Sequence, residues 1–234
     1  MKILLRALSL FALLLFSQNV FSQDLDRHSV INRLIESYGG EENLRKLDSV
    51  VQEWDMVALM SKRHGKDIRG IQPPNRLMVK LSYPNKVERR ILNGEEGLVL
   101  FDGREPQVAT DPQRDAMRLQ LMRLYSPLVL RRKIENRTLT LEGEFCALTL
   151  VEHGVQADYL VNLDTWRIEK VAGTLNMGGG DMQFVTEYSD FEFVEGVLVH
   201  RQENKFAGNV NTALLKLRDI QFNADLDGSH FFIE

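Results

Sequence analysis

The sequence predicts a mainly β protein, an all-antiparallel sheet or barrel that a few helices interrupt. Many short segments carry apolar residues at alternate positions, as strands with one buried face do. Turn dipeptides such as Asn93-Gly94 and Asp102-Gly103 separate these segments, which is typical of antiparallel hairpins. Apolar residues at helical spacing are confined to the amino-terminal part and to one segment near the middle of the chain.

Residues 1–22 have the pattern of a cleaved secretory signal peptide. A basic stretch with Lys2 and Arg6 precedes an apolar run over 7–16, and small and polar residues follow up to Ser22, where we expect cleavage. A retained anchor is the alternative, but the apolar run is shorter than the roughly 20 residues that a membrane-spanning helix needs. No cysteine lies near the cleavage site, so a lipid-modified amino terminus is excluded.

Residues 23–234 are expected to form one soluble domain, because no repeat, linker or domain boundary is evident. The single cysteine, Cys146, cannot form an intramolecular disulfide, which fits a bacterial periplasm better than a disulfide-dense secreted module. We expect Cys146 to pack as a small apolar group, since a catalytic thiol needs a basic partner that the sequence does not identify. The 29 basic and 33 acidic residues alternate along the chain, so nothing favours a nucleic-acid partner.

Three helices are expected. The first runs from Leu25 to Tyr38 and stops at Gly39-Gly40, and a short second one covers 41–47 with acidic residues at its positive end. The third covers Pro112–Tyr125, with Asp111 as its cap and Ser126-Pro127 as its end. Its apolar residues occupy more than one face, which predicts a helix that is largely buried or touches an apolar partner.

Strands are expected on both sides of this third helix. The first is a largely buried strand from Val50 to Met60, where apolar residues fall on alternate and some intervening positions. Further strands are expected at 77–83, 87–92, 98–101, 139–141, 145–151, 157–163, 166–171, 182–188, 197–206 and 214–222.

The common catalytic and metal-binding motifs are missing. The chain has neither a Gly-x-Ser-x-Gly nucleophile elbow nor a phosphate-binding loop, and its five histidines are far apart in sequence. The run Gly178-Gly179-Gly180 is better explained as a hairpin loop than as a phosphate site. We therefore expect no catalytic residue, no metal ligand and no cofactor, although a site assembled by folding is not visible in sequence.

Apolar side chains are plentiful on the predicted strands and on the third helix. If the strands curl around that helix, a gap between them would be lined by methionine and branched side chains, which adapt to acyl chains of varied shape. An ordinary filled core is the alternative for each residue. The candidate cavity residues are Trp54, Met56, Leu77, Val79, Leu81, Met117, Leu121 and Leu124.

Three segments carry a resemblance to a known family. They are YGGEENLRKLDSV at 38–50, YLVNLDTWRIEK at 159–170 and YSDFEFVEGVLVH at 188–200. Together with the order of the elements, they resemble the bacterial outer-membrane lipoprotein-sorting and lipoprotein-carrier-like (LolA-like) superfamily of periplasmic proteins. The resemblance covers most of the mature chain through loose strand-and-turn patterns, and it departs at His200-Arg201, where Pro-His or Pro-Lys is expected.

The resemblance implies a curved antiparallel sheet that forms an incomplete barrel wrapped around helices and binds acyl chains or other hydrophobic ligands. The leading hypothesis is therefore a non-catalytic periplasmic carrier for a lipid, a lipoprotein acyl chain or a similar ligand. A periplasmic sensor or scaffold that binds an envelope protein partner is the second hypothesis, and an enzyme is the third. A continuous apolar cavity beside the third helix would favour the carrier, and a filled core would favour the scaffold.

Overall fold

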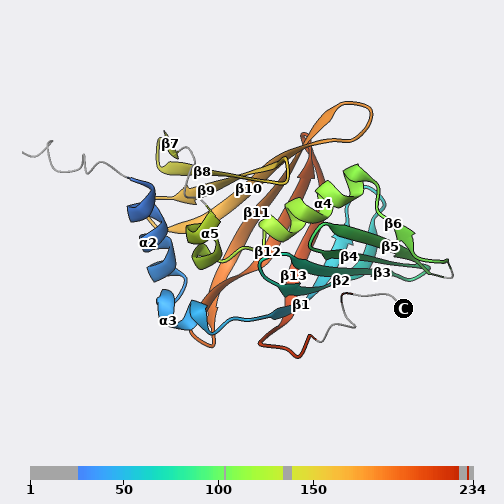
Figure 1. Ribbon diagram of the computed structural model, residues 1–234, viewed down its shortest axis with the longest axis horizontal. Coiled ribbons are helices and arrows are strands. Elements are labelled where there is room, and N and C mark those ends of the chain that lie inside the picture. Colours follow the sequence, from blue (N-terminus) through green and yellow to red (C-terminus); the bar gives the residue numbers. More distant parts are fainter. Residues whose placement is uncertain (1–25, 103, 134–138, 227–230, 232–234) are drawn as a thin grey trace, which may run out of the picture.

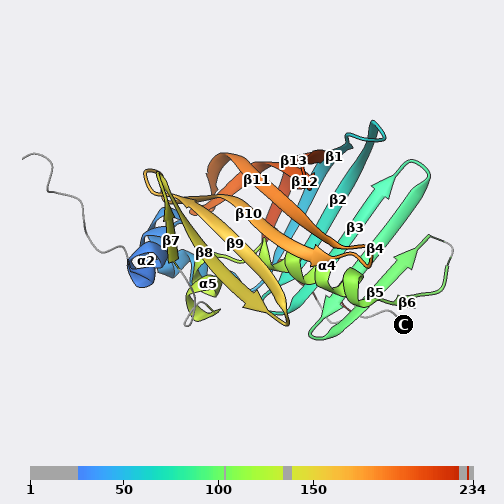
Figure 2. The same ribbon diagram turned by 90° about the horizontal axis from the view of Figure 1, so that it is seen from above.

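The computed structural model describes residues 26–102, 104–133, 139–226 and 231 (Figure 1). The expected signal peptide lies outside the described residues. Within the described residues, thirteen antiparallel strands form one sheet in the order β6-β5-β4-β3-β2-β1-β13-β12-β11-β10-β9-β8-β7. The sheet curves around the helices and does not close, since β6 and β7 are its two edges (Figure 2). The predicted mainly β fold with an incomplete barrel is confirmed.

Every expected strand is present, although β10 and β11 extend past their expected ends at 171 and 188. The first half of the sheet contains β1 (Val50–Ala58), β2 (Arg63–Gln72), β3 (Arg76–Tyr83), β4 (Lys86–Asn93), β5 (Glu96–Phe101) and β6 (Gln107–Val108). The second half contains β7 (Leu139–Glu142), β8 (Phe145–Glu152), β9 (Val155–Asn162), β10 (Arg167–Asn176), β11 (Asp181–Val194), β12 (Val197–Ala207) and β13 (Val210–Phe222).

Two amino-terminal helices lie at one end of the sheet. Helix α2 (Arg27–Ser37) begins where the Asp26 carboxylate accepts a hydrogen bond from the backbone N–H of Ser29 at 2.8 Å. Helix α3 (Gly40–Arg45) follows Gly39, whose φ of +113° suits glycine. A Cβ at Gly39 would lie 2.0 Å from the carbonyl oxygen of Gly196, so glycine allows the α2–α3 junction to touch the β11–β12 turn.

Helix α4 (Asp111–Met122) lies across the concave face of the sheet (Figures 1 and 2). A capping box between Thr110 and Gln113 starts it. The helix contacts β3, β4 and β5 on one arm of the sheet and β9 and β10 on the other. Its buried side chains, which fill much of the space between the arms, are Met117, Leu119, Leu121 and Met122.

The expected helix at Pro112–Tyr125 is three residues too long at its carboxyl end, because α4 stops at Met122. The dipeptide Ser126-Pro127 ends no helix but starts one, α5 (Pro127–Lys133), which the sequence analysis missed. Proline suits the first turn of a helix as well as the position after one, so its meaning depends on residues further along the chain.

The second correction concerns β2, which the sequence analysis did not predict. The expected strand from Val50 to Met60 ends at Ala58, and β2 follows after a short turn. The inward-facing positions of β2 include Asp67 and Arg69, which are buried and charged. Apolar alternation is therefore absent at the place where the strand meets the core.

Candidate ligand-binding site

A cavity of about 250 Å³ lies between α4 and the concave face of the sheet. Five of the eight candidate residues line it, and they come from three elements. Met56 belongs to β1, Met117 belongs to α4, and the three residues from β3 are Leu77, Val79 and Leu81. The strand residues gather here because alternate side chains of a strand point to the same face of a sheet.

A larger cavity of about 460 Å³ lies nearer to α3 and α5. Apolar walls come from Leu44 of α3, Ile71 of β2 and Leu128 of α5, and the candidate residue Leu124 also lines it. Basic side chains stand among the lining residues, at Arg45, Arg132 and Lys133.

A third hollow of about 110 Å³ adjoins both cavities. It shares Gln52 and Leu124, among others, with the larger cavity, and it shares Arg123 with the cavity under α4. A row of adjoining hollows therefore runs along the concave face, and Arg123 stands where two of them meet.

The remaining two candidate residues lie elsewhere. Leu121 faces a separate hollow of about 210 Å³, which His153 and Glu152 also line. Trp54 is fully buried beneath a group of charged side chains, and its ring lies 5.0 Å from the guanidinium carbon of Arg69. The indole N–H of Trp54 donates to Gln52 at 3.2 Å.

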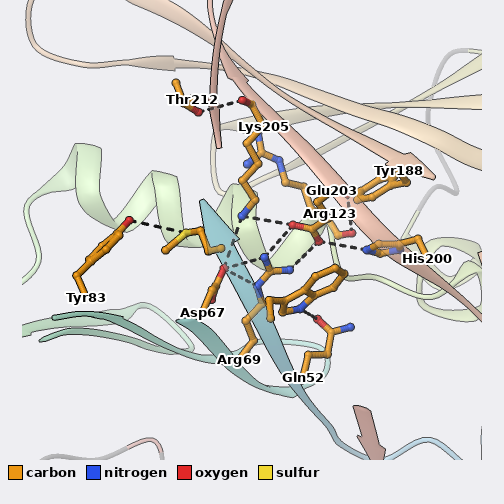
Figure 3. A network of polar contacts seen from close by, with 12 residues as sticks. Gln52, Asp67, Arg69, Tyr83, Arg123, Tyr188, His200, Glu203, Lys205 and Thr212 are labelled. Carbon is orange, nitrogen blue, oxygen red and sulfur yellow. Dashed lines mark hydrogen bonds and ion pairs between the residues drawn. The ribbon is translucent and has the colours of Figure 1, made fainter. Parts of the chain in front are cut away.

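The charged group is centred on Arg69, whose side chain is completely buried (Figure 3). Its guanidinium donates to Asp67 from Nε at 3.0 Å and from Nη2 at 2.8 Å, and to Glu203 from Nη1 at 2.7 Å and from Nη2 at 2.8 Å. The His200 ring lies 3.1 Å from Glu203 and stacks on Trp54. Two carboxylates thus hold one guanidinium in place.

Two further cations adjoin this group. Lys205 Nζ lies 3.5 Å from Glu203 Oε2 and 3.8 Å from Asp67 Oδ2, which is too far for good hydrogen bonds. Arg123 follows α4 and extends toward Lys205 (Figure 3). Its Nε and Nη2 are shielded from solvent, and no described residue accepts a hydrogen bond from either.

The environment shifts the pKa values of these groups. Burial opposes ionisation of Glu203, but the positive charges of Arg69 and Lys205 hold the pKa of this carboxyl well below its ordinary value. Burial lowers the pKa of Lys205 to about 8, and the positive charge of Arg69 contributes to the same change. Burial also lowers the pKa of Arg123, although an arginine remains cationic at neutral pH.

No protein-family model matches the chain, and no curated protein matches its sequence. Solved structures do match. A LolA superfamily protein from Nitrosomonas europaea is 12% identical with a TM-score of 0.56, over 88% of this chain and 97% of that one. An outer membrane lipoprotein-sorting protein domain from Vibrio parahaemolyticus is 9% identical with a TM-score of 0.52, over 86% and 94%. The chain has the LolA-like fold.

A third similar structure is a DUF1329 family protein from Desulfovibrio piger, 7% identical with a TM-score of 0.50 over 88% of this chain and 96% of that one. The resemblance found in the sequence is therefore confirmed at the level of the LolA-like fold. No helix among the described residues is both long enough and apolar enough to cross a membrane.

Within this LolA-like fold, the charged group is the part of the site that sequence reasoning missed. Its members come in pairs two residues apart, Asp67 with Arg69 on β2 and Glu203 with Lys205 on β12. Such a spacing puts both side chains on the same face of a strand, which could have indicated a charged inner surface. In the part of the chain that the structure describes, no three His, Cys, Asp or Glu side chains gather as a metal site would.

Proposed function

We propose that this protein is a non-catalytic periplasmic carrier that shields a lipid, a lipoprotein acyl chain or a similar hydrophobic ligand from water. Residues 1–22 are its cleaved signal peptide, and residues 23–234 are its single domain. The observation that carries the proposal is the row of apolar-lined hollows between the unclosed sheet and the helices. The names of the first two similar structures, a LolA superfamily protein and a lipoprotein-sorting domain, support it.

The size of the hollows agrees with a ligand of modest size. The larger cavity, at about 460 Å³, falls within the range of roughly 300–1,000 Å³ that is usual for small-molecule sites. Each methylene group moved from water into an apolar cavity contributes about 0.8 kcal/mol, so part of one acyl chain already gives useful affinity. Carriage of this kind requires no chemical step.

The first test is mass spectrometry of the protein purified from its native envelope without detergent. We expect lipid or acylated peptide to be released from it on denaturation. The same protein after delipidation should bind a fluorescent fatty acid with a stoichiometry of about one. The proposal would be overturned if the purified protein carried no ligand and also failed to bind added lipids and fatty acids.

The second test fills the larger cavity. Val129 lines it, and Val129→Trp should weaken binding of the fluorescent fatty acid by about tenfold or more, because the indole takes the space of several methylene groups. Met60→Trp is the matched control, since Met60 is 78% exposed beyond the end of β1. Equal weakening by both variants would argue against a ligand in this cavity.

A sensor or scaffold is the second candidate function, and exposed apolar side chains at one end of the sheet favour it. The turn after β1 lies beside the β12–β13 turn, because the Leu59 N–H donates to the Thr212 carbonyl oxygen at 2.9 Å. Met60, on the first turn, and Val210, at the start of β13, are exposed and could contact an envelope protein. Crosslinking to a partner that persists in the Val129→Trp variant, with no lipid bound, would favour this function over carriage.

A further inference from the structure

The concave face of the sheet carries an unbalanced positive charge. Beside the cavity under α4, three cations, Arg69, Arg123 and Lys205, face two carboxylates, Asp67 and Glu203. Arg69 already donates two hydrogen bonds to each carboxylate, although Asp67 Oδ1 has no hydrogen-bond partner among the described residues. A buried charge without a partner is costly, so the excess charge calls for an anion.

The donors that lack full partners gather at one place. Arg123 and Lys205 both line the cavity of about 250 Å³, and Arg123 lies close enough to depress the pKa of Lys205 further. Thr186 on β11 pairs with Lys205 on β12 in the sheet, and its hydroxyl is buried with no hydrogen-bond partner among the described residues. Two cations that lack full partners therefore line one cavity, and the unpaired Thr186 hydroxyl belongs to the strand beside it.

Much of the lining of the same cavity is apolar. Met56, Leu77, Val79, Leu81 and Met117 line it beside the charged groups. Arg90 also lines it, but its guanidinium is held by Glu88, with 2.6 Å between Nη2 and Oε1. The lining is therefore amphipathic, since it combines cations that lack full partners with thioether and branched side chains.

We propose that this cavity takes the head of a single-chain anionic amphiphile, a carboxylate or phosphate joined to an apolar tail, and that Arg123 and Lys205 pair with the oxygens of that head. The inference rests on the proposed function and gives its ligand a chemical class. Guanidinium and ammonium groups form strong charge-assisted hydrogen bonds with carboxylate and phosphate oxygens. A volume of about 250 Å³ suits one chain better than two.

The test compares matched probes on the delipidated mature protein by isothermal titration calorimetry at pH 7. Dodecanoate and dodecyl phosphate carry the anionic head and the tail, dodecanol carries the tail with a neutral head, and inorganic phosphate carries no tail. We expect each anionic amphiphile to bind about tenfold or more tightly than dodecanol, as one charge-assisted hydrogen bond at a dry site allows. Inorganic phosphate alone should bind far more weakly than dodecyl phosphate.

Variants assign the effect to the two cations. Arg123→Met and Lys205→Met should each bring the affinity for dodecanoate close to the affinity of the same variant for dodecanol. Arg218→Met and Lys216→Met remove the same charges from exposed positions on β13, and both should leave the preference intact. Circular dichroism of every variant verifies that it is folded, and measurable binding of dodecanol verifies that the cavity still takes a tail.

The outcomes separate this inference from the proposed function. Equal affinity of the wild type for dodecanoate and dodecanol would overturn the proposal of an anionic head but would not contradict the proposed carrier function. Binding of inorganic phosphate as tight as that of dodecyl phosphate would overturn the amphiphile in favour of a free anion. Failure of all the probes with tails to bind would overturn both proposals together.

Discussion

Arg69 of β2 and Glu203 of β12 form a bidentate ion pair across the concave face, although β1 and β13 separate their strands in the sheet. The side chains are 0% and 2% exposed. Asp67 accepts two more hydrogen bonds from the same guanidinium. Burial alone would lower the pKa of Arg69, but these two carboxylates raise it above its usual value.

Removal of Arg69 should therefore damage the fold. We expect Arg69→Met to lower the free energy of unfolding by about 3–5 kcal/mol, because it leaves Asp67 and Glu203 buried without their cation. Urea unfolding followed by circular dichroism measures this change. Arg218→Met, which breaks exposed ion pairs near Glu53 and Asp55, should change stability by less than about 1 kcal/mol. A similar small change for Arg69→Met would mean that water reaches the two carboxylates.

Removal of the Arg123 charge should instead raise the free energy of unfolding. Its Nε and Nη2 are buried without partners, so Arg123→Met removes a desolvated charge and keeps the apolar stem. We expect the delipidated Arg123→Met protein to be more stable than the wild type by about 1 kcal/mol or more, the usual cost of an unsatisfied buried polar group. Urea unfolding measures this change as a higher midpoint concentration of urea, with the same dependence of the unfolding free energy on urea concentration in both proteins.

Bound ligand should reverse this difference. Saturating dodecanoate stabilises the wild type by mass action but stabilises Arg123→Met less, because the variant lacks a cation for the head. A clear loss of stability in the delipidated variant would contradict the view that Arg123 is unpaired in the empty protein.

The sheet could be predicted from the sequence wherever one face of a strand is apolar. Strand β8 alternates cleanly, because its inward residues Cys146, Leu148 and Leu150 are all buried and apolar. Strand β2 broke that rule, because its inward positions carry Asp67 and Arg69, which pair with each other and, through Arg69, with Glu203 on β12. A charge is stable in such a place only through a partner that folding brings to it, and one sequence does not display that pairing.

The cavity was predictable in part for a related reason. Alternation places Leu77, Val79 and Leu81 of β3 on one face, and the structure puts all three beside α4. Alternation does not show which buried side chains border a hollow and which are fully packed. The sequence therefore offers no means to tell that Met56 lines the cavity whereas Trp54 does not. That distinction depends on the curvature of the sheet, which long-range contacts determine.

Cys146 should be inert in the folded protein. Its side chain is 0% exposed on β8, and burial raises the pKa of the thiol to about 11. Because the thiolate is the reactive form, we expect negligible labelling by iodoacetamide at pH 8 in buffer and full labelling in 6 M urea. Mass spectrometry measures the labelled fraction. Rapid labelling of the native protein would show that β8 opens locally or that the thiol has a functional environment.

The pKa of Lys205 gives stability a pH dependence with a definite sign. Groups that face it are Asp67 and Arg69 from β2, Glu203 on its own strand and Arg123 after α4. Its pKa is about 8 in the folded protein and 10.5 in the unfolded chain. Between these values the unfolded chain binds more protons than the folded protein, so the contribution of Lys205 to stability increases as pH rises from about 8 to 10.5.

We therefore expect the delipidated wild type to gain up to about 3 kcal/mol relative to Lys205→Met over this range. Urea unfolding of both proteins at pH 7, 8, 9 and 10 measures the difference between their free energies of unfolding. The contributions of groups that titrate alike in the two proteins cancel in this difference. Lys216→Met, at an exposed position on β13, should run parallel to the wild type. Dodecanoate should reverse the trend, because the anion favours the protonated amine, so its affinity should fall as pH rises through about 8. An affinity that stays constant from pH 7 to pH 10 would mean that Lys205 does not face the bound head.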